Sequence, residues 1–147
     1  METFRLTTLE ELAEVATKVL AVAGALPQTA AVVLALKGDL GSGKTTFTQT
    51  LARALGVTEP VTSPTFVIMK GYELEGQIFD TLIHIDAYRL ETSVEMTVLG
   101  FANLIATPRI LIVIEWAEKI SDLLPEQTIN LTFNIEGDER VITLNYG

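Results

Sequence analysis

The chain has 147 residues, of which 48% are hydrophobic, with a formal net charge of −9 and no cysteine. This length suits a core of ordinary size, and we expect residues 1–147 to form a single domain. The acidic surplus disfavours an extended contact with a nucleic-acid backbone, and the lack of cysteine excludes disulfides and thiolate metal sites. No apolar run approaches the roughly 18 to 20 residues that cross a bilayer, so we expect a cytoplasmic protein without membrane contact.

The first predicted element is a helix that begins at Thr8. Thr8 and Glu11 have the spacing of a capping box, in which two side chains satisfy free N–H groups at the start of a helix. Apolar residues then recur at helical spacing until Gly24 and Pro27 end the helix. The next segment, residues 30–36, is a short apolar run typical of a buried strand.

A phosphate-binding motif follows that strand. Residues 38–45 match the pattern G-x-x-x-x-G-K-[ST], in which glycines let backbone N–H groups approach phosphate oxygens. Lys44 would place its ammonium against the terminal phosphates, and Thr45 would offer its hydroxyl to Mg²⁺. Helical spacing continues downstream to Gly56, so the positive end of a helix dipole faces the bound anion. The expected nucleotide-binding residues of this segment are Gly38, Asp39, Leu40, Gly41, Ser42, Gly43, Lys44, Thr45 and Thr46.

The rest of the chain alternates apolar runs with helical stretches. The expected strands are residues 66–72, 78–86, 109–115, 128–135 and 140–146, and the expected helices are residues 93–106, interrupted near Gly100, and 117–123. The first two of these strands and the last two form hairpins around glycine-containing turns. We therefore predict an α/β fold: one P-loop NTPase-like domain with a mostly parallel central sheet, flanking helices and antiparallel hairpins at the edges.

Two carboxylates end apolar strands of this predicted sheet. Asp86 follows Leu-Ile-His-Ile, and Glu115 follows five consecutive aliphatic residues. Open α/β sheets bind ligands at the carboxyl ends of their strands, where either side chain can hold Mg²⁺ or orient an attacking water. The alternative for each is an ordinary carboxylate at a strand end. With the P-loop in the same domain, we expect Lys44, Asp86 and Glu115 to be the catalytic residues.

Three further residues lie near these positions in the sequence. Thr65 follows Ser-Pro and can close on the γ-phosphate, although a rigid proline turn is the alternative. Trp116 follows Glu115, where an aromatic ring can stack on a base, anchor a partner or cover the core. His84 is interpreted as a hydrogen-bonded packing residue, with a direct role as the alternative; metal ligation by histidine has little support because the chain has one histidine.

Four segments together resemble the bacterial TsaE family, formerly called YjeE. They are the P-loop continued through Thr46-Phe47, Thr62-Ser63-Pro64-Thr65-Phe66, His84-Ile85-Asp86-Ala87-Tyr88-Arg89-Leu90 and Ile114-Glu115-Trp116-Ala117-Glu118. Their order and spacing fit the family over nearly the whole domain. The resemblance implies an ATPase that supports synthesis of threonylcarbamoyladenosine beside the anticodon of tRNA. It also implies partners named TsaB and TsaD, which would handle the tRNA, so that this chain meets tRNA mainly indirectly.

The resemblance also assigns roles to individual residues. The cofactors it implies are ATP, as substrate, and Mg²⁺. The implied metal ligands are Thr45, Glu115 and Asp86, with Asp86 acting either as a ligand or in catalysis. The further residues assigned to the nucleotide site are Thr65, Trp116, Thr8 and Leu9, the last two beside the adenine.

Two other functions remain open from the sequence. A small-molecule P-loop kinase would use the same loop, but it needs a second substrate pocket and usually an arginine-rich lid, whereas the five arginines here are spread along the chain. A nucleotide-gated binding module would bind ATP with negligible turnover. Product analysis distinguishes the kinase, and measured hydrolysis distinguishes the binding module.

Overall fold

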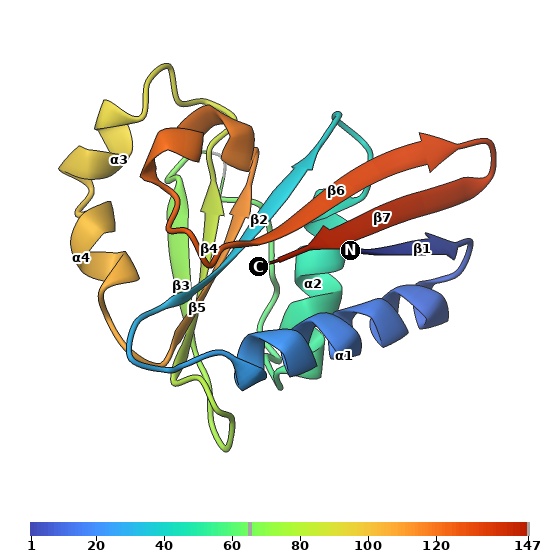
Figure 1. The fold of residues 1–147 in the computed structure, drawn as a ribbon, viewed down its shortest axis with the longest axis horizontal. Helices are drawn as coiled ribbons and strands as arrows, with labels where there is room; N and C mark the ends of the chain where they lie inside the picture. Colours follow the sequence, from blue (N-terminus) through green and yellow to red (C-terminus); the bar gives the residue numbers. More distant parts are fainter. Residues whose placement is uncertain (65, 147) are drawn as a thin grey trace.

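The computed structural model describes residues 1–64 and 66–146, whose strands form one seven-stranded sheet in the order β1-β7-β6-β2-β5-β4-β3 (Figure 1). The strands are β1 (Glu2–Leu6), β2 (Val32–Gly38), β3 (Met69–Glu73), β4 (Thr81–Asp86), β5 (Ile110–Glu115), β6 (Ile129–Glu136) and β7 (Glu139–Asn145). Neighbours among β6, β2, β5 and β4 are parallel, whereas β3 and the β7–β1 pair are antiparallel additions at the two edges. The predicted α/β fold, with a parallel centre and antiparallel hairpins at its edges, is confirmed.

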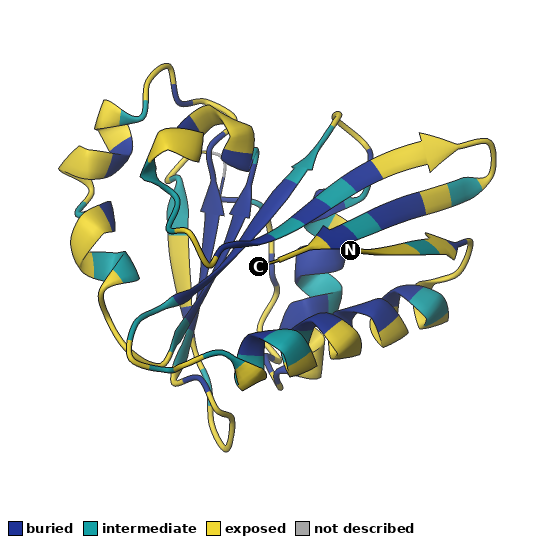
Figure 2. Ribbon diagram, in the orientation of Figure 1, coloured by how far each residue is buried: buried dark blue, intermediate teal, exposed yellow. Residues whose placement is uncertain are grey.

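Helices cover the central strands on both faces. They are α1 (Leu9–Ala25), α2 (Lys44–Ala54), α3 (Val94–Val98), α4 (Phe101–Ile105) and the 3₁₀ helix η1 (Ala117–Leu123). Alternate residues of β2 point to opposite faces: Leu34 and Leu36 join the core beneath α1 and α2, while Val33 and Ala35 join the core beneath α3, α4 and η1. The buried side of α1 faces the sheet in Figure 2. No helix in the described part of the chain combines the length and apolar character needed to span a bilayer.

The start of α1 is fixed by the predicted capping residues. The backbone N–H of Glu11 donates to the hydroxyl of Thr8 at 3.2 Å, as in a capping box. The carboxylate of Glu11 accepts from the backbone N–H of Thr7 at 3.3 Å, one residue earlier than the usual pattern, and from the hydroxyl of Thr8 at 3.1 Å. These two bonds lower the pKa of Glu11. The first turn of α1 is therefore held in a defined position next to β1.

Two edge elements differ from the sequence prediction. β1 was not predicted, because a five-residue edge strand carries little hydrophobic signal; it pairs with β7 along its whole length. β3 begins at Met69 rather than at residue 66, because Ile68 has a left-handed backbone with φ of 70° that cannot continue a β ladder. The break predicted near Gly100 is present between α3 and α4, where that glycine has φ of 80°.

The parallel register brings the carboxyl ends of three central strands together at one end of the sheet. Leu36 of β2 pairs with Glu115 of β5, and Glu115 pairs in turn with Asp86 of β4. Gly38 ends β2 at the same end of the sheet, two residues beyond Leu36. The P-loop and both predicted carboxylates therefore converge at the carboxyl ends of parallel strands, where open α/β sheets bind ligands.

Candidate functional site

A cavity of about 580 Å³ lies at the carboxyl ends of the central strands. Residues 40–46 line it on one side, and its lining extends to the start of α1 and the β6–β7 hairpin. Its volume is in the range of small-molecule sites, about 300 to 1,000 Å³. The other predicted site residues that line it are Asp86, Glu115, Trp116, Thr8 and Leu9. Gly38 and Asp39 lie behind the loop instead, and Thr65 lies outside the described residues.

Two glycines set the backbone of the P-loop. Gly38 has φ of 149° and is paired with Phe133; a Cβ there would lie 2.5 Å from the carbonyl oxygen of Phe133, which no side chain tolerates. Gly43 has φ of 108° and precedes the first residue of the eleven-residue helix α2. The free N–H groups and positive dipole end of α2 therefore face the cavity, as an anion-binding loop requires.

Lys44 lies at the base of this cavity with 5% of its surface exposed. Its ammonium donates to the backbone carbonyl oxygens of Gly38 and of Asp39, the latter at 3.0 Å, and lies 3.9 Å from the centre of the Trp116 ring. Burial lowers the pKa of Lys44, while the negative charge of Glu115 opposes that shift. Gly38 and Asp39 thus orient the lysine although neither lines the cavity.

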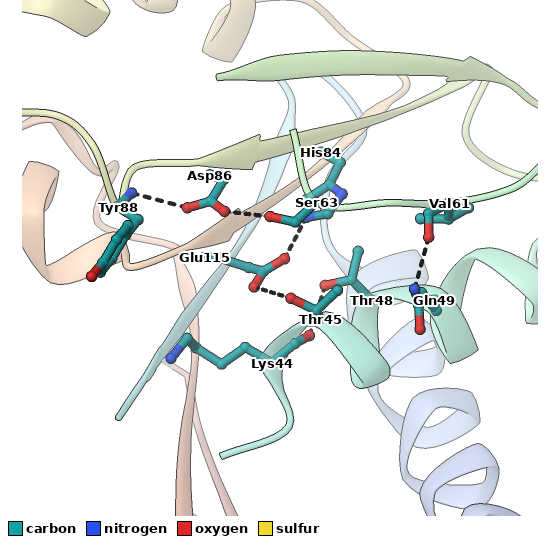
Figure 3. A network of polar contacts seen from close by, with 10 residues as sticks. All are labelled: Lys44, Thr45, Thr48, Gln49, Val61, Ser63, His84, Asp86, Tyr88 and Glu115. Atoms are coloured by element: carbon teal, nitrogen blue, oxygen red, sulfur yellow. Dashed lines mark hydrogen bonds and ion pairs between the residues drawn. The ribbon is translucent and has the colours of Figure 1, made fainter. Parts of the chain in front are cut away.

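Glu115 joins the P-loop to the sheet (Figure 3). Its Oε1 accepts a hydrogen bond of 2.7 Å from the hydroxyl of Thr45, and its Oε2 lies 2.6 Å from Nε2 of His84. The side chains of Glu115 and His84 are 3% and 0% exposed. A carboxylate and a threonine hydroxyl are therefore within hydrogen-bond distance of each other beside the phosphate-binding loop.

Asp86 is held by a different set of contacts. Its Oδ1 accepts a hydrogen bond of 2.9 Å from the backbone N–H of Tyr88, and its Oδ2 accepts one from the hydroxyl of Ser63. The same carboxylate lines the cavity although only 4% of the residue is exposed. Asp86 thus connects the Thr-Ser-Pro segment to the end of β4, next to Glu115.

The donor set fits a magnesium nucleotide. Mg²⁺ is usually held by one or two carboxylates, with phosphate oxygens and waters completing six ligands, and Thr45 with Glu115 offers this kind of partial site. Residues 1–64 and 66–146 contain no group of three or more acidic, histidine or cysteine side chains gathered for a metal. The hydroxyl of Ser42 is buried in the loop and has no hydrogen-bond partner within those ranges.

Trp116, Thr8 and Leu9 also line the cavity, Trp116 from the end of β5 and the other two from the start of α1. Trp116 has a left-handed backbone with φ of 59°, and its ring contacts Tyr88 at 5.0 Å between ring centres. Thr8 has a structural task as the cap of α1, whereas the side chain of Leu9 is 67% exposed. These three residues are placed where they can reach a nucleotide bound at the loop.

Several cavity residues were not predicted from the sequence. Ser63 lies in one of the four family segments, but the sequence does not indicate its hydrogen bond to Asp86. The far wall of the cavity includes Phe133, Arg140 and Ile142 of the β6–β7 hairpin. No local pattern marks these hairpin residues. They reach the cavity because β7 pairs with β1 beside the start of α1, which is a long-range feature of the sheet.

Comparisons with known proteins agree with this fold. The family model described as threonylcarbamoyl adenosine biosynthesis protein TsaE matches residues 6–142. The tRNA threonylcarbamoyladenosine biosynthesis protein TsaE of Bacillus subtilis is 43% identical over 112 residues, covering 76% of this chain and 67% of that protein. The proteins of the same name from Haemophilus influenzae and Treponema pallidum are 35% and 36% identical, covering 78% and 76% of this chain and 70% and 80% of their own lengths.

A solved structure is similar over almost the whole chain. The crystal structure of Bacillus subtilis YdiB superposes with a TM-score of 0.73 and 32% sequence identity, covering 99% of this chain and 84% of that one. The resemblance inferred from the four sequence segments is thereby confirmed. The chain belongs to the TsaE family of threonylcarbamoyl adenosine biosynthesis proteins.

Proposed function

We propose that this protein is a Mg²⁺-dependent ATPase that supports threonylcarbamoyladenosine modification of tRNA adenosine next to the anticodon. Membership of the TsaE family supports the pathway. The observation that carries the ATPase activity is the convergence of the α2 N-terminus, Lys44 and the Thr45–Glu115 pair on one cavity. P-loop enzymes use the same kinds of groups for phosphoryl transfer to water.

Each group has a distinct task in this proposal. The N–H groups of residues 41–46 and the ammonium of Lys44 bind the phosphates. They also stabilise the negative charge that develops on the phosphates of the ADP leaving group. Thr45 and Glu115 would hold Mg²⁺, which when bound neutralises phosphate charge. Asp86 would orient the attacking water or join in holding Mg²⁺, while its oxygens accept from the backbone N–H of Tyr88 and the hydroxyl of Ser63. The products are ADP and inorganic phosphate.

The far wall of the cavity is assigned to the base. Thr8 and Leu9 line this part of the cavity beside Phe133, and apolar side chains suit the flat faces of adenine. Trp116 lies beside the ammonium of Lys44 instead and is assigned to the nucleotide-responsive part of the site. Thr65 is proposed to sense the γ-phosphate, on the resemblance alone. This assignment makes the nucleotide span the loop and the start of α1.

The proposed partners are TsaB and TsaD, in the cytoplasm. The chain would dock on this pair and support repeated turnover by hydrolysing ATP, with low activity of its own. The net charge of −9 supports an arrangement in which the partners hold the tRNA, because a polyanion is repelled by this surface.

Reconstituted tRNA modification tests the proposal. The mixture contains TsaB, TsaD, tRNA and the other substrates, and this protein is omitted, added as the parent, added as Lys44→Ala, or added with a non-hydrolysable ATP analogue. Repeated modification is expected only with the parent and hydrolysable ATP. Equal modification in all four mixtures contradicts the proposed role, and a phosphorylated metabolite in place of free phosphate supports the kinase alternative.

A further inference from the structure

His84 is a buried polar residue that the proposed chemistry leaves without a task. It lies in the middle of β4, is fully buried, and does not line the cavity. Register pairs it with Val113, two residues before Glu115 on β5. His84 therefore lies one layer beneath the site, where it contacts the carboxylate but not a ligand in the cavity.

The polarity of the His84–Glu115 contact follows from the chemistry of the two groups. An ionised carboxylate only accepts hydrogen bonds, so Nε2 of His84 must carry the hydrogen in the 2.6 Å contact with Oε2. The other carboxylate oxygen accepts from the hydroxyl of Thr45. Two donors from different elements thus fix both oxygens of Glu115, one from β4 and one from the P-loop (Figure 3).

A purely structural role explains His84 poorly. Its Nδ1 is buried and has no hydrogen-bond partner among the residues that the structure describes. A buried polar atom without a partner is unfavourable, and an aliphatic residue, such as those on either side of His84 in β4, would fill the same space without it. Within those residues, the imidazole ring makes one hydrogen bond, to Glu115. This hydrogen bond is what distinguishes the histidine from an aliphatic residue at the same position.

We propose that His84 is a positioning residue that holds Oε2 of Glu115 so that Oε1 faces the Thr45 hydroxyl, in the orientation that receives Mg²⁺. The inference rests on the proposed function, because it needs Thr45 and Glu115 to hold the metal. Without the donor, the buried carboxylate can rotate away from Thr45, and this weakens its hold on a divalent ion. Outer hydrogen-bond partners of metal ligands typically change metal affinity by about tenfold to a hundredfold.

Three variants separate positioning from packing. His84→Met removes the donor at similar volume, and His84→Gln keeps an N–H near the position of Nε2. Leu82→Val disturbs the same face of the same strand, two residues away and equally buried, without touching Glu115. If His84→Met does not fold, His84→Asn replaces it, because its amide is too short to reach Oε2.

The readouts are metal binding and nucleotide binding, measured separately. Calorimetry in EDTA gives the ATP affinity without metal, and electron paramagnetic resonance of Mn²⁺ gives the metal affinity of the nucleotide complex. We expect His84→Met to weaken Mn²⁺ binding by about tenfold to a hundredfold, with the metal-free ATP affinity almost unchanged. His84→Gln should restore most of the Mn²⁺ affinity, and Leu82→Val should match the parent.

Two results overturn the inference. One is Mn²⁺ binding by His84→Met, or by His84→Asn in its place, that equals that of the parent. The other is a loss of Mn²⁺ affinity in His84→Gln and in Leu82→Val that equals the loss in His84→Met, which would assign the effect to packing. Failure of the parent to bind Mn²⁺ with ATP would instead contradict the proposed function, so the two failures are distinguishable.

Discussion

The hydroxyl of Thr45 donates a 2.7 Å hydrogen bond to Oε1 of Glu115, which is 70 residues away in the sequence. Thr45 reaches this point because Gly43 lets α2 begin directly at Lys44, and Glu115 reaches it because β5 is paired in parallel with β2. The contact joins the phosphate-binding loop to the neighbouring strand. A divalent ion that takes both oxygens as ligands would replace this hydrogen bond, which gives the site its expected metal dependence.

Replacement of Glu115 by alanine should affect hydrolysis more than nucleotide binding. Lys44 and the loop N–H groups still bind phosphates in Glu115→Ala, but the carboxylate for Mg²⁺ is lost, so we expect Mg²⁺-dependent hydrolysis to fall by about a hundredfold or more. Phosphate release across a Mg²⁺ titration measures the effect. Glu126→Ala, which removes an exposed carboxylate that does not line the cavity, is the control. Equal hydrolysis by Glu115→Ala and the parent at every Mg²⁺ concentration would remove Glu115 from this role.

Lys44→Ala should nearly abolish both ATP binding and turnover. The variant loses the one ammonium that the loop carbonyls and the Trp116 ring hold at the base of the cavity. Calorimetric titration with ATP and a phosphate-release assay measure the two losses. Lys18→Ala on α1, where the ammonium lies over the Phe4 ring, removes an equal charge away from the cavity and should retain both properties. Retained binding by Lys44→Ala would contradict the assignment of the loop.

ATP binding should depend on pH at the alkaline side. Burial lowers the pKa of Lys44 below its ordinary 10.5, so this lysine loses its proton at a lower pH than a free lysine. Binding through the ammonium then weakens as pH rises through the lowered pKa, and bound phosphates favour proton uptake there. Between the lowered pKa of Lys44 and its ordinary value, the unfolded chain without ATP binds more protons than the folded protein. In that pH range, Lys44 therefore makes the free energy of unfolding rise with pH.

Calorimetry in two buffers of different ionisation enthalpy measures that proton uptake directly. The parent should take up protons on binding ATP at alkaline pH. Lys44→Arg, which keeps its charge throughout this range, should lose the Lys44-dependent part. The same uptake in Lys44→Arg would show that another group is responsible.

Much of the site was predictable because its residues sit in strong local patterns. The P-loop lies between an apolar strand and an amphipathic helix, and the two carboxylates each follow a buried strand, so α/β geometry alone brings them together. The remainder depends on long-range pairing. Ser63 meets Asp86, and Arg140 reaches the far wall, only through the final arrangement of loops and edge strands. Ile68 shortens β3 through a left-handed backbone that its β-branched side chain does not suggest.

Alanine substitutions at two P-loop glycines, Gly38 and Gly41, should lower the free energy of unfolding by different amounts. A Cβ at Gly38 meets the Phe133 carbonyl oxygen at 2.5 Å, whereas a Cβ at Gly41 has nothing within 4 Å. Both positions have positive φ, so Gly41→Ala should cost about 1 kcal/mol of unfolding free energy from backbone strain alone. Gly38→Ala should cost clearly more. Urea unfolding measures the two values, and an equal cost would mean that the β2–β6 contact relaxes freely.

Thr8 and Leu9 should separate the stability of α1 from contact with the base. Thr8→Ala removes the cap of α1 and should lower the unfolding free energy by about 1 kcal/mol. Leu9→Ala removes an exposed side chain of the cavity wall and should weaken ATP binding with little change in stability. Thermal unfolding and ATP titration, applied to both variants, give the two quantities. Unchanged ATP affinity in Leu9→Ala would remove that residue from the nucleotide site.

The most direct test of the account is a crystal structure with Mn²⁺ and a non-hydrolysable ATP analogue, in which anomalous scattering locates the metal. The account predicts phosphates against residues 41–46 and Lys44, with the metal peak bound by the Thr45 hydroxyl and the Glu115 carboxylate. A nucleotide bound elsewhere, or a metal peak away from both side chains, would contradict it.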